Sequence, residues 1–349
     1  MRRVQKLKAS SRDARSKWEV AHAALKRASA SRHRRILSPD IVRSLLPSRV
    51  ATMPARAARA NARAAASQLE TTSSAYREAL ASVHGAVDGV VRTNLEGLTW
   101  WVSIHPSVTG AARERVVAKQ RFPFRNITQA REFALGPVML DIGANIGRMS
   151  IPRVILGDFV QVYCAEPDPL NYAALVRNVV DNGLRGLVLP DCVAIGAETG
   201  TAHLRHAKYS GGHRLVSEED TSDTIEVPCS RLDDWCEHLA IDPQLVTYVK
   251  VDTQGWEREV LRGAPTLLTC RHIAWQIEIS PSMLSAAGSS PVQLYDMCAE
   301  HFSHFIDLGK RAEGPRVRRT RDLGEALDYV QADDSQTDAI LFNSESMIG

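Results

Sequence analysis

The pattern of apolar and polar positions changes character near residue 138. From there to the C-terminus, short apolar runs alternate with longer segments in which apolar residues recur every three or four positions. Short apolar runs are typical of buried strands, and the three-to-four spacing is typical of amphipathic helices. Because the two kinds of segment alternate, the pattern predicts an α/β fold with a doubly wound, mostly parallel sheet.

The predicted elements follow one another in a regular order. We expect strands at 138–142, 160–165, 187–194, 246–252 and 272–279. We expect helices at 146–155, 169–181, 256–268 and 291–301. A polar, hairpin-like insert is expected at about 200–230, and two closing strands near 302–308 and 336–342.

Residues 1 to about 95 have a different pattern. They are rich in Ala, Arg and Ser, and helix formers dominate between three prolines. We predict helices near 12–36 and 56–92. The second has an apolar stripe that we expect to pack on a neighbour or on the main domain. The stripe comprises Leu69, Tyr76, Leu80, Val83, Val87, Val90 and Val91. We therefore divide the chain into a helical N-terminal extension, 1–110, and a main domain, 111–349.

The composition is that of an ordinary globular protein. The 349 residues are 44% hydrophobic, which suffices for one full-sized core and an extra segment. No run of about 18 apolar residues is present, and the N-terminus lacks the apolar stretch of a secretory signal, so we expect a cytoplasmic protein without a membrane span. The six cysteines form no C-x-x-C pair, which agrees with reduced thiols.

The net charge of +3 hides a strong asymmetry. Residues 1–70 contain 17 Lys and Arg against 4 Asp and Glu, a net +13, and the remaining 26 and 36 give −10. Three interpretations of this basic arm stay open. It is a solvated helical face, a surface that binds nucleic acid or an anionic membrane by releasing counterions, or an organelle transit peptide.

The stretch "VMLDIGANIGRMS", residues 138–150, joins a predicted strand to a predicted helix through a glycine-rich turn. Gly143 and Gly147 would let the backbone approach a ligand, and the helix N-terminus would offer N–H groups to an anion such as a carboxylate. Asn145 stands where the fingerprint G-x-G-x-x-G has its second glycine, which disfavours NAD.

Acidic residues recur at the ends of successive predicted strands. Ligands of open α/β sheets bind at the carboxyl ends of the strands. Glu166 comes 25 residues after Asp141, where a carboxylate suits a pair of ribose hydroxyls. A nucleoside cofactor is therefore expected beside these acids, which are Asp141, Glu166, Asp191, Asp252 and Glu278.

Lys250 and Asp252 are two residues apart and therefore share one side of a predicted strand. They form either a structural ion pair or a site that orients an acceptor oxygen and helps to remove its proton. Asp252 is the first candidate base, although a neighbouring Lys250 would favour its charged form and leave it to orient the acceptor.

Histidines in the insert offer an alternative base. His203, His206 and His213 are either surface residues of a flexible hairpin or catalytic groups, and His213 is our choice because it adjoins two glycines that would let the loop close. Asp252 and Glu278 could instead hold a divalent cation. We predict no metal ligands, because no diagnostic spacing is present.

Six elements of the sequence resemble FkbM-type S-adenosylmethionine-dependent methyltransferases. They are "LDIGANIG", "AEPDPLNYAALVRNV", "VAIG", "RLDDW", "VKVDTQGWEREVLRGA" and "IEISP", within about residues 136–343. The resemblance implies a class I methyltransferase (Rossmann-like) fold with a seven-stranded sheet whose last strand is antiparallel. It also implies S-adenosylmethionine as the cofactor and O-methylation of hydroxyls on sugars or other small natural products.

The resemblance also implies roles for individual residues. The methionine end of the cofactor would contact Asp141, Gly143, Asn145 and Gly147, and the ribose would contact Glu166. Asp191 or Cys192 would lie beside the adenine, although family members commonly have Asn where Cys192 stands. Asp252 and Glu278 would face the reacting methyl group or the acceptor.

Three hypotheses for the whole chain follow. The first is an O-methyltransferase with a small-molecule or glycan acceptor, in which the insert, Trp256, the region after Glu278 and "NLEGLTWWVSIHP" build the acceptor pocket. The second is an RNA methyltransferase that uses the basic arm, and the third is a non-catalytic scaffold that retains the fold. The long N-terminal helices could also pair two copies of the chain.

Overall fold

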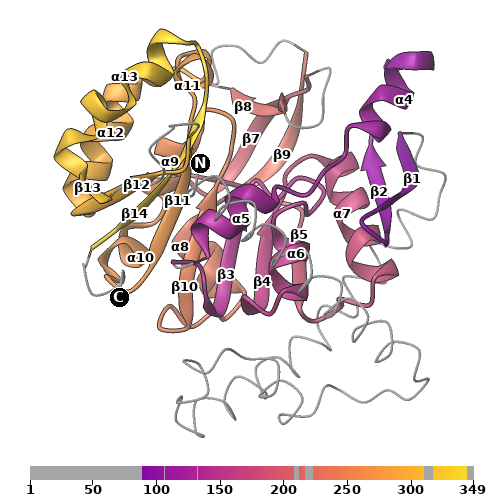
Figure 1. Ribbon diagram of the computed structural model, residues 1–349, viewed down its shortest axis with the longest axis horizontal. Helices are drawn as coiled ribbons and strands as arrows, with labels where there is room; N and C mark the ends of the chain where they lie inside the picture. The colour runs from indigo at the N-terminus through magenta and orange to yellow at the C-terminus, as the bar shows by residue number, and fades with distance from the viewer. Residues whose placement is uncertain are drawn as a thin grey trace, which may run out of the picture.

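The computed structural model describes residues 89–105, 107–131, 133–207, 212–216, 223–309 and 317–343. Its centre is a twisted sheet in the strand order β13-β12-β14-β11-β10-β3-β4-β5 (Figure 1). The middle one of its five parallel strands is β3 (Gly136–Ile142), which pairs in parallel with β4 (Phe159–Ala165) and β10 (Val246–Val251). Outside them, β5 (Val188–Asp191) pairs in parallel with β4, and β11 (Ala274–Ile279) with β10. The predicted mostly parallel α/β sheet is confirmed.

The far edge of the sheet differs in one strand from the prediction. β14 (Thr337–Phe342) runs antiparallel to β11 and to β12 (His304–Asp307), as the resemblance implies for the last strand. An extra strand, β13 (Val317–Arg319), pairs antiparallel with β12. Within the described residues the sheet therefore has eight strands, not seven. The sequence VRR of β13 lacks the apolar run that marked the other strands.

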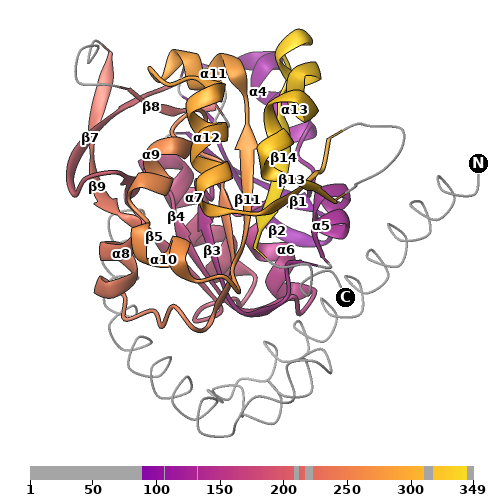
Figure 2. The same ribbon diagram turned by 90° about the vertical axis from the view of Figure 1, so that its left-hand side faces the viewer.

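Helices cover both faces of this sheet, as a doubly wound fold requires (Figure 2). One face packs against α5 (Phe124–Ala130), α6 (Ser150–Ile155) and α7 (Pro169–Asp181). The other packs against α8 (Leu232–His238), α9 (Glu257–Arg262), α10 (Pro265–Thr269), α11 (Pro281–Ala286), α12 (Pro291–His301) and α13 (Leu323–Ala332). Neighbouring residues of β3 serve opposite faces, because Met139 belongs to the first core and Leu140 to the second.

Two predicted helices have different bounds in the structure. The helix expected at 146–155 begins only at Ser150, because Gly147 has a φ of 86° and continues the turn. The helix expected at 256–268 is two helices, α9 and α10, because Gly263 and the following Ala264–Pro265 end the first and start the second. The helices α8 and α13 were not predicted.

The first described elements are strands, not helix. β1 (Val90–Leu95) and β2 (Leu98–Ser103) form an antiparallel hairpin whose turn residues, Glu96 and Gly97, both have positive φ. Such turns match the twist of paired strands. Val90 and Val91 therefore leave the predicted helical stripe, and residues 1–88 of the predicted N-terminal extension lie outside the described residues.

The hairpin packs on α7 and shares its core. The backbone N–H of Trp101 donates to Asn178 Oδ1 at 2.6 Å, and Asn178 Nδ2 donates to the Trp101 carbonyl at 3.0 Å. Trp100 and Val102 alternate with Trp101 and are fully buried. The segment "NLEGLTWWVSIHP" thus contributes a hairpin to the fold, followed by α4 (Gly110–Ala118).

The polar insert is a second, smaller sheet. It consists of β6 (Ala194–Gly196), β7 (Gly200–Arg205), β8 (Arg214–Val216) and β9 (Thr224–Arg231), in the order β6-β9-β7-β8. β7 pairs antiparallel with both β8 and β9, so the hairpin character that we expected at 200–230 is confirmed. Among the described residues, no helix combines the length and apolar character needed to cross a membrane.

The start of α12 provides a test of local stability. The Ser290 hydroxyl accepts from the Gln293 N–H at 3.3 Å, and the Gln293 side chain accepts from the Ser290 N–H at 3.1 Å, which forms a capping box. We expect Ser290→Ala to lower the free energy of unfolding by about 1 kcal/mol. In thermal unfolding this corresponds to a Tm lower by about 2–4 °C. Ser285→Ala, in exposed α11, is the control, and an equal loss there would contradict the assignment.

Candidate functional site

The predicted acids meet at one edge of the main sheet. Asp141 is the penultimate residue of β3, Glu166 follows β4, and Asp252 follows β10. Asp191 ends β5, and Glu278 is the penultimate residue of β11. Because these five strands are parallel, their carboxyl ends share an edge, and the acids line it from β5 across to β11.

The glycine turn after β3 is required by the fold itself. Gly143 has a φ of 80°, and a Cβ there would lie 1.9 Å from the backbone oxygen of Asp252. Gly147 has a φ of 86°, and its Cβ would lie 2.7 Å from a methyl group of Leu175 in α7. Asn145, between them, also has a positive φ of 53°. The glycines thus let the turn pack against β10 and α7. The sequence had suggested only close approach to a ligand as the reason for glycine at these two positions.

Asp141 presents an acceptor that the described residues leave unused. Its side chain is fully buried, and Oδ2 accepts from the Ser150 hydroxyl. Oδ1 has no hydrogen-bond partner among the described residues. Burial raises the pKa of Asp141, while the charge of Lys250 and the bond from Ser150 act in the opposite direction. A buried acceptor without a donor fits a ligand that brings one, such as an ammonium group.

Glu166 holds the loop that follows β4. Its Oε2 accepts from the N–H of Asn145 at 2.7 Å, and its Oε1 accepts from the N–H of Asp168 at 3.0 Å and from Asn171 Nδ2 at 3.3 Å. The carboxyl group thereby ties the glycine turn of β3 to the start of α7. Burial and the nearby charge of Asp168 raise the pKa of Glu166 to about 8, against the effect of these hydrogen bonds.

Asp191 and Cys192 lie beside this loop at the end of β5. Asp191 Oδ2 accepts from the Trp235 indole N–H at 2.8 Å, and the Asp191 carbonyl accepts from the Glu166 N–H at 3.1 Å. Burial, together with the charges of Glu166 and Asp191, raises the pKa of the Cys192 thiol to about 12. The thiol is therefore neutral, and an adenine contact at Asp191 or Cys192 stays a prediction.

The Lys250 and Asp252 side chains form an ion pair, as their two-residue spacing predicted. Lys250 Nζ lies 2.7 Å from Asp252 Oδ2, and the two side chains are 6% and 30% exposed. Gln254 Nε2 then bridges the carboxyl groups, at 2.9 Å from Asp252 Oδ1 and 2.6 Å from Glu278 Oε2. Glu278 Oε1 accepts from Gln336 Nε2 at 3.0 Å.

The two carboxyl groups of this network have opposite pKa shifts. Burial would raise the pKa of Asp252, but the charge and hydrogen bond of Lys250 outweigh it and lower the pKa. Burial and the charges of Asp252 and Asp338 raise the pKa of Glu278 well above its usual range. Asp252 therefore favours the ionised form and Glu278 the protonated form. Environments that separate the pKa values of paired acids are typical of catalytic sites.

His213 belongs to a different group of residues. Its Nδ1 accepts from the Ala207 N–H at 3.0 Å, and its ring centroid lies 4.9 Å from that of His206, which lies 5.5 Å from that of His105. We call these three side chains the histidine cluster. Burial lowers the pKa of His213, partly offset by the charge of Asp168. The cluster joins the Glu166 side of the site through Asp168, not the Lys250–Asp252 pair, so a catalytic role for His213 stays a prediction.

Several residues of the site were not predicted from the sequence. Gln254 and Gln336 complete the carboxyl network, and Glu257 accepts from the N–H groups of Thr253 and Gly255, which fixes the loop after β10. Asp168 caps α7 by accepting from the Asn171 N–H at 2.7 Å. Only Asp168 carried a sequence signal, because Asp followed by Pro is typical of a helix start.

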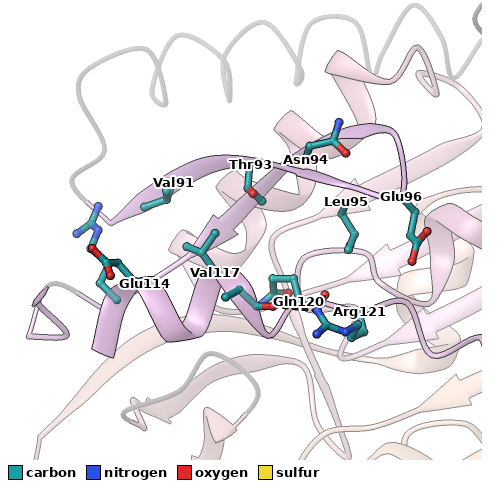
Figure 3. Close-up of a pocket in the computed structure, with 11 residues that line it drawn as sticks. Val91, Thr93, Asn94, Leu95, Glu96, Glu114, Val117, Gln120 and Arg121 are labelled. Atoms are coloured by element: carbon teal, nitrogen blue, oxygen red, sulfur yellow. Dashed lines mark hydrogen bonds between the residues drawn. The ribbon is translucent and has the colours of Figure 1, made fainter. Parts of the chain in front are cut away.

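A separate cavity of about 600 Å³ lies between β1 and α4 (Figure 3). Val91 and Leu95 of β1 face Val117 of α4 across it, with Glu114 and Arg121 at its ends. None of the predicted cofactor-binding or catalytic residues lines this cavity, although Asn94, Leu95 and Glu96 belong to a segment that we expected in the acceptor pocket. Among the described residues, no group of three or more His, Cys, Asp and Glu side chains is arranged to hold a metal ion.

One family model matches the part of the chain that contains the site. Residues 141–311 match the model of the methyltransferase FkbM domain, a range that includes every predicted site residue. A comparison with curated proteins finds no match.

Solved structures similar to this chain include a methyltransferase FkbM from Methylobacillus flagellatus KT, at 18% identity and a TM-score of 0.33, over 60% of this chain and 44% of that one. The chain thus spans less than half the length of that protein. A precorrin-6y C5,15-methyltransferase from Geobacter metallireducens GS-15 has 10% identity and a TM-score of 0.37, over 70% of this chain and 94% of that one. A TYW2 from M. jannaschii in complex with AdoMet has 13% identity and a TM-score of 0.33, over 74% and 89%.

Proposed function

We propose, from the premise that residues 141–311 form a methyltransferase FkbM domain, that the protein transfers a methyl group from S-adenosylmethionine to a hydroxyl group of a sugar, glycan or small natural product. The observation that carries the proposal is the row of acids at the carboxyl ends of adjacent strands. One of them, Asp141, keeps a buried acceptor oxygen without a donor. Another, Glu166, stands where a nucleoside ribose is expected.

The side chains on the β3 and β4 side fit the cofactor. Asp141 Oδ1 would accept from its ammonium group, and the turn from Gly143 to Gly147 would lie along its amino-acid end. Glu166 would accept from its ribose, and Asp191 and Cys192 would lie beside its adenine. When bound, S-adenosylmethionine supplies an activated methyl group with a good leaving group.

Asp252 has the properties of an acceptor-orienting group. Lys250 and Gln254 fix both oxygens of its carboxylate, and its side chain remains 30% exposed. When the hydroxyl group of the methyl acceptor donates a hydrogen bond to Asp252 Oδ1, a lone pair of the hydroxyl oxygen stays free to react with the methyl group. A lowered pKa does not prevent Asp252 from taking the proton, because an alcohol oxygen that gains a methyl group becomes far more acidic than a carboxylic acid.

Glu278 supports this arrangement, because its raised pKa favours the protonated form. A neutral carboxyl group beside ionised Asp252 can donate a hydrogen bond without adding a second negative charge. Gln254 and Gln336 hold both of its oxygens. Glu278 thus keeps the network intact, and Asp252 carries the charge that meets the acceptor.

The proposal is tested with the purified full chain. Calorimetric titration with S-adenosylmethionine is expected to give saturable binding, and a screen of sugars and hydroxylated natural products is expected to give methyl transfer to at least one. An absence of binding at millimolar cofactor would remove the proposal. Binding without transfer to any acceptor would favour the scaffold hypothesis.

Replacing Asp252 separates orientation from binding. We expect Asp252→Asn to lower kcat by about 10²-fold, because the amide cannot take a proton, while the affinity for S-adenosylmethionine stays unchanged. Asp296→Asn, at an exposed position of α12, is the matched control. Equal kcat values for the two variants would show that Asp252 has no part in the reaction.

An RNA acceptor is the second candidate, and the charge of +13 in residues 1–70 favours it. Clustered cations bind polyanions by releasing counterions, so binding must weaken steeply as salt rises. We expect deletion of residues 1–70 to abolish both the RNA binding and its salt dependence if this candidate holds. If RNA affinity falls only slightly with salt and the deletion does not change this dependence, an RNA acceptor is excluded.

A further inference from the structure

The hydrogen bonds of Glu166 limit what its carboxylate can accept from a ligand. An ionised carboxylate offers about four lone-pair positions. Three of them are used by Asn145, Asp168 and Asn171, at 2.7, 3.0 and 3.3 Å. One position therefore remains, whereas a ribose brings two hydroxyl donors. The second hydroxyl needs a different acceptor.

His206 is held next to Glu166 through Asp168. Asp168 donates its backbone N–H to Glu166 Oε1, and its carboxylate Oδ2 lies 2.7 Å from His206 Nε2. The Asp168 side chain is fully buried, and its other oxygen caps α7, so this residue is fixed on both sides. The His206 ring is 26% exposed and remains accessible to a ligand.

The bond to Asp168 decides which nitrogen of His206 can accept. An ionised carboxylate only accepts hydrogen bonds, so His206 Nε2 carries the hydrogen. In the neutral ring, Nδ1 is then an acceptor on the opposite edge. The other two rings of the histidine cluster have their Nδ1 atoms occupied, since His105 accepts from the Ser107 N–H at 3.3 Å and His213 from the Ala207 N–H at 3.0 Å. Their Nε2 atoms are donors, which leaves His206 Nδ1 as the acceptor of the cluster.

We infer that His206 is a cofactor-binding residue, whose Nδ1 accepts from one ribose hydroxyl of the nucleoside while Glu166 accepts from the other. This inference rests on the proposed function, and it adds Asp168 as the positioning residue that joins the two acceptors. The ring of His206 lies between those of His105 and His213, at 5.5 and 4.9 Å, which restricts its rotation. The end of β2 and the insert thereby become part of the nucleoside site.

The test uses calorimetric titration with S-adenosylhomocysteine and with its 2′-deoxy and 3′-deoxy analogues. We expect His206→Ala to weaken S-adenosylhomocysteine binding by about 3- to 10-fold, the contribution of one neutral hydrogen bond. One deoxy analogue should bind the parent and the variant equally, because it lacks the hydroxyl that His206 accepts. The other analogue should still show the full difference. His206→Gln, which keeps an acceptor, should restore part of the affinity.

The control is His203→Ala, in strand β7 just before His206, which should change no affinity. Thermal unfolding of each variant verifies that it is folded. The inference is overturned if His206→Ala binds S-adenosylhomocysteine as the parent does, or if both deoxy analogues show the same loss as the complete ligand. Failure of the parent itself to bind would overturn the proposed function as well, so the two failures are distinguishable.

Discussion

Replacing Gly143 with alanine is expected to lower the free energy of unfolding by at least about 3 kcal/mol and to abolish cofactor binding. The added Cβ would lie 1.9 Å from the backbone oxygen of Asp252, and the φ of 80° is unfavourable for any residue with a side chain. The added Cβ and the Asp252 oxygen are both fixed to the backbone, so the turn or the end of β10 must move. A loss of this size corresponds to a Tm lower by about 6–12 °C.

Gly288 offers a matched control for this prediction. Its φ of 79° is almost the same, but a Cβ there would meet no atom within 4 Å. Gly288→Ala should therefore cost only about 1 kcal/mol, the price of the left-handed conformation alone. Similar Tm values for the two variants would mean that close packing against Asp252 does not explain the requirement for glycine at position 143.

Replacing Glu166 with alanine is expected to weaken S-adenosylmethionine binding at least about 100-fold. The variant loses a charged acceptor for the ribose, and it leaves the N–H groups of Asn145 and Asp168 without their partner. A hydrogen bond to a charged group contributes about 1.5–3 kcal/mol, and 100-fold corresponds to about 2.7 kcal/mol, so the lost bond to the ribose and the disturbed turn account for this loss. Glu300→Ala, at an exposed position of α12, should bind the cofactor normally.

The raised pKa of Glu166 gives this prediction a pH dependence. Below its pKa of about 8 the carboxyl group is mostly protonated, whereas the ribose hydroxyl needs the ionised form as acceptor. Affinity should therefore rise roughly 10-fold between about pH 7 and pH 9. Glu166→Gln should remove the rise, and an unchanged profile in that variant would assign the titration to another group.

The same shift has a consequence for stability. Folding raises the pKa of Glu166 from 4.5 to about 8, so the folded protein binds this proton more tightly than the unfolded chain. The stabilising contribution is complete below about pH 4.5 and is lost as the pH rises through about 8. Denaturant unfolding across this range should show the parent losing stability relative to Glu166→Gln.

The sequence predicted the sheet and the placement of its acids for a physical reason. Each of the central strands is buried on both faces and therefore appears as a short apolar run, followed by a polar residue where the strand ends. Since the strands are parallel, the residues at their ends must share one edge. Asp141, Glu166 and Asp252 could be assigned to one site without knowledge of the contacts between them.

The contacts themselves depend on tertiary structure and left no local signal. Gln336 reaches Glu278 from the residue before β14, 58 positions away in the chain, and His206 reaches Asp168 from the insert, 38 positions away. For Val90 and Val91 a local signal was present but predicted the wrong element. Their spacing continued a helical stripe, but the turn at Glu96 and Gly97 pairs them with β2.

The middle one of the five parallel strands, β3, separates two parts of the protein with different proposed roles. The residues proposed to hold the nucleoside come from a continuous stretch, 141–206, whereas those of the proposed acceptor network come from 250–336 on the other side of β3. Substitutions in the second stretch can therefore change the acceptor preference while the first stretch continues to bind the cofactor. A chimera that exchanges residues 250–343 with those of a related enzyme should acquire the donor's substrate preference and retain the original cofactor affinity.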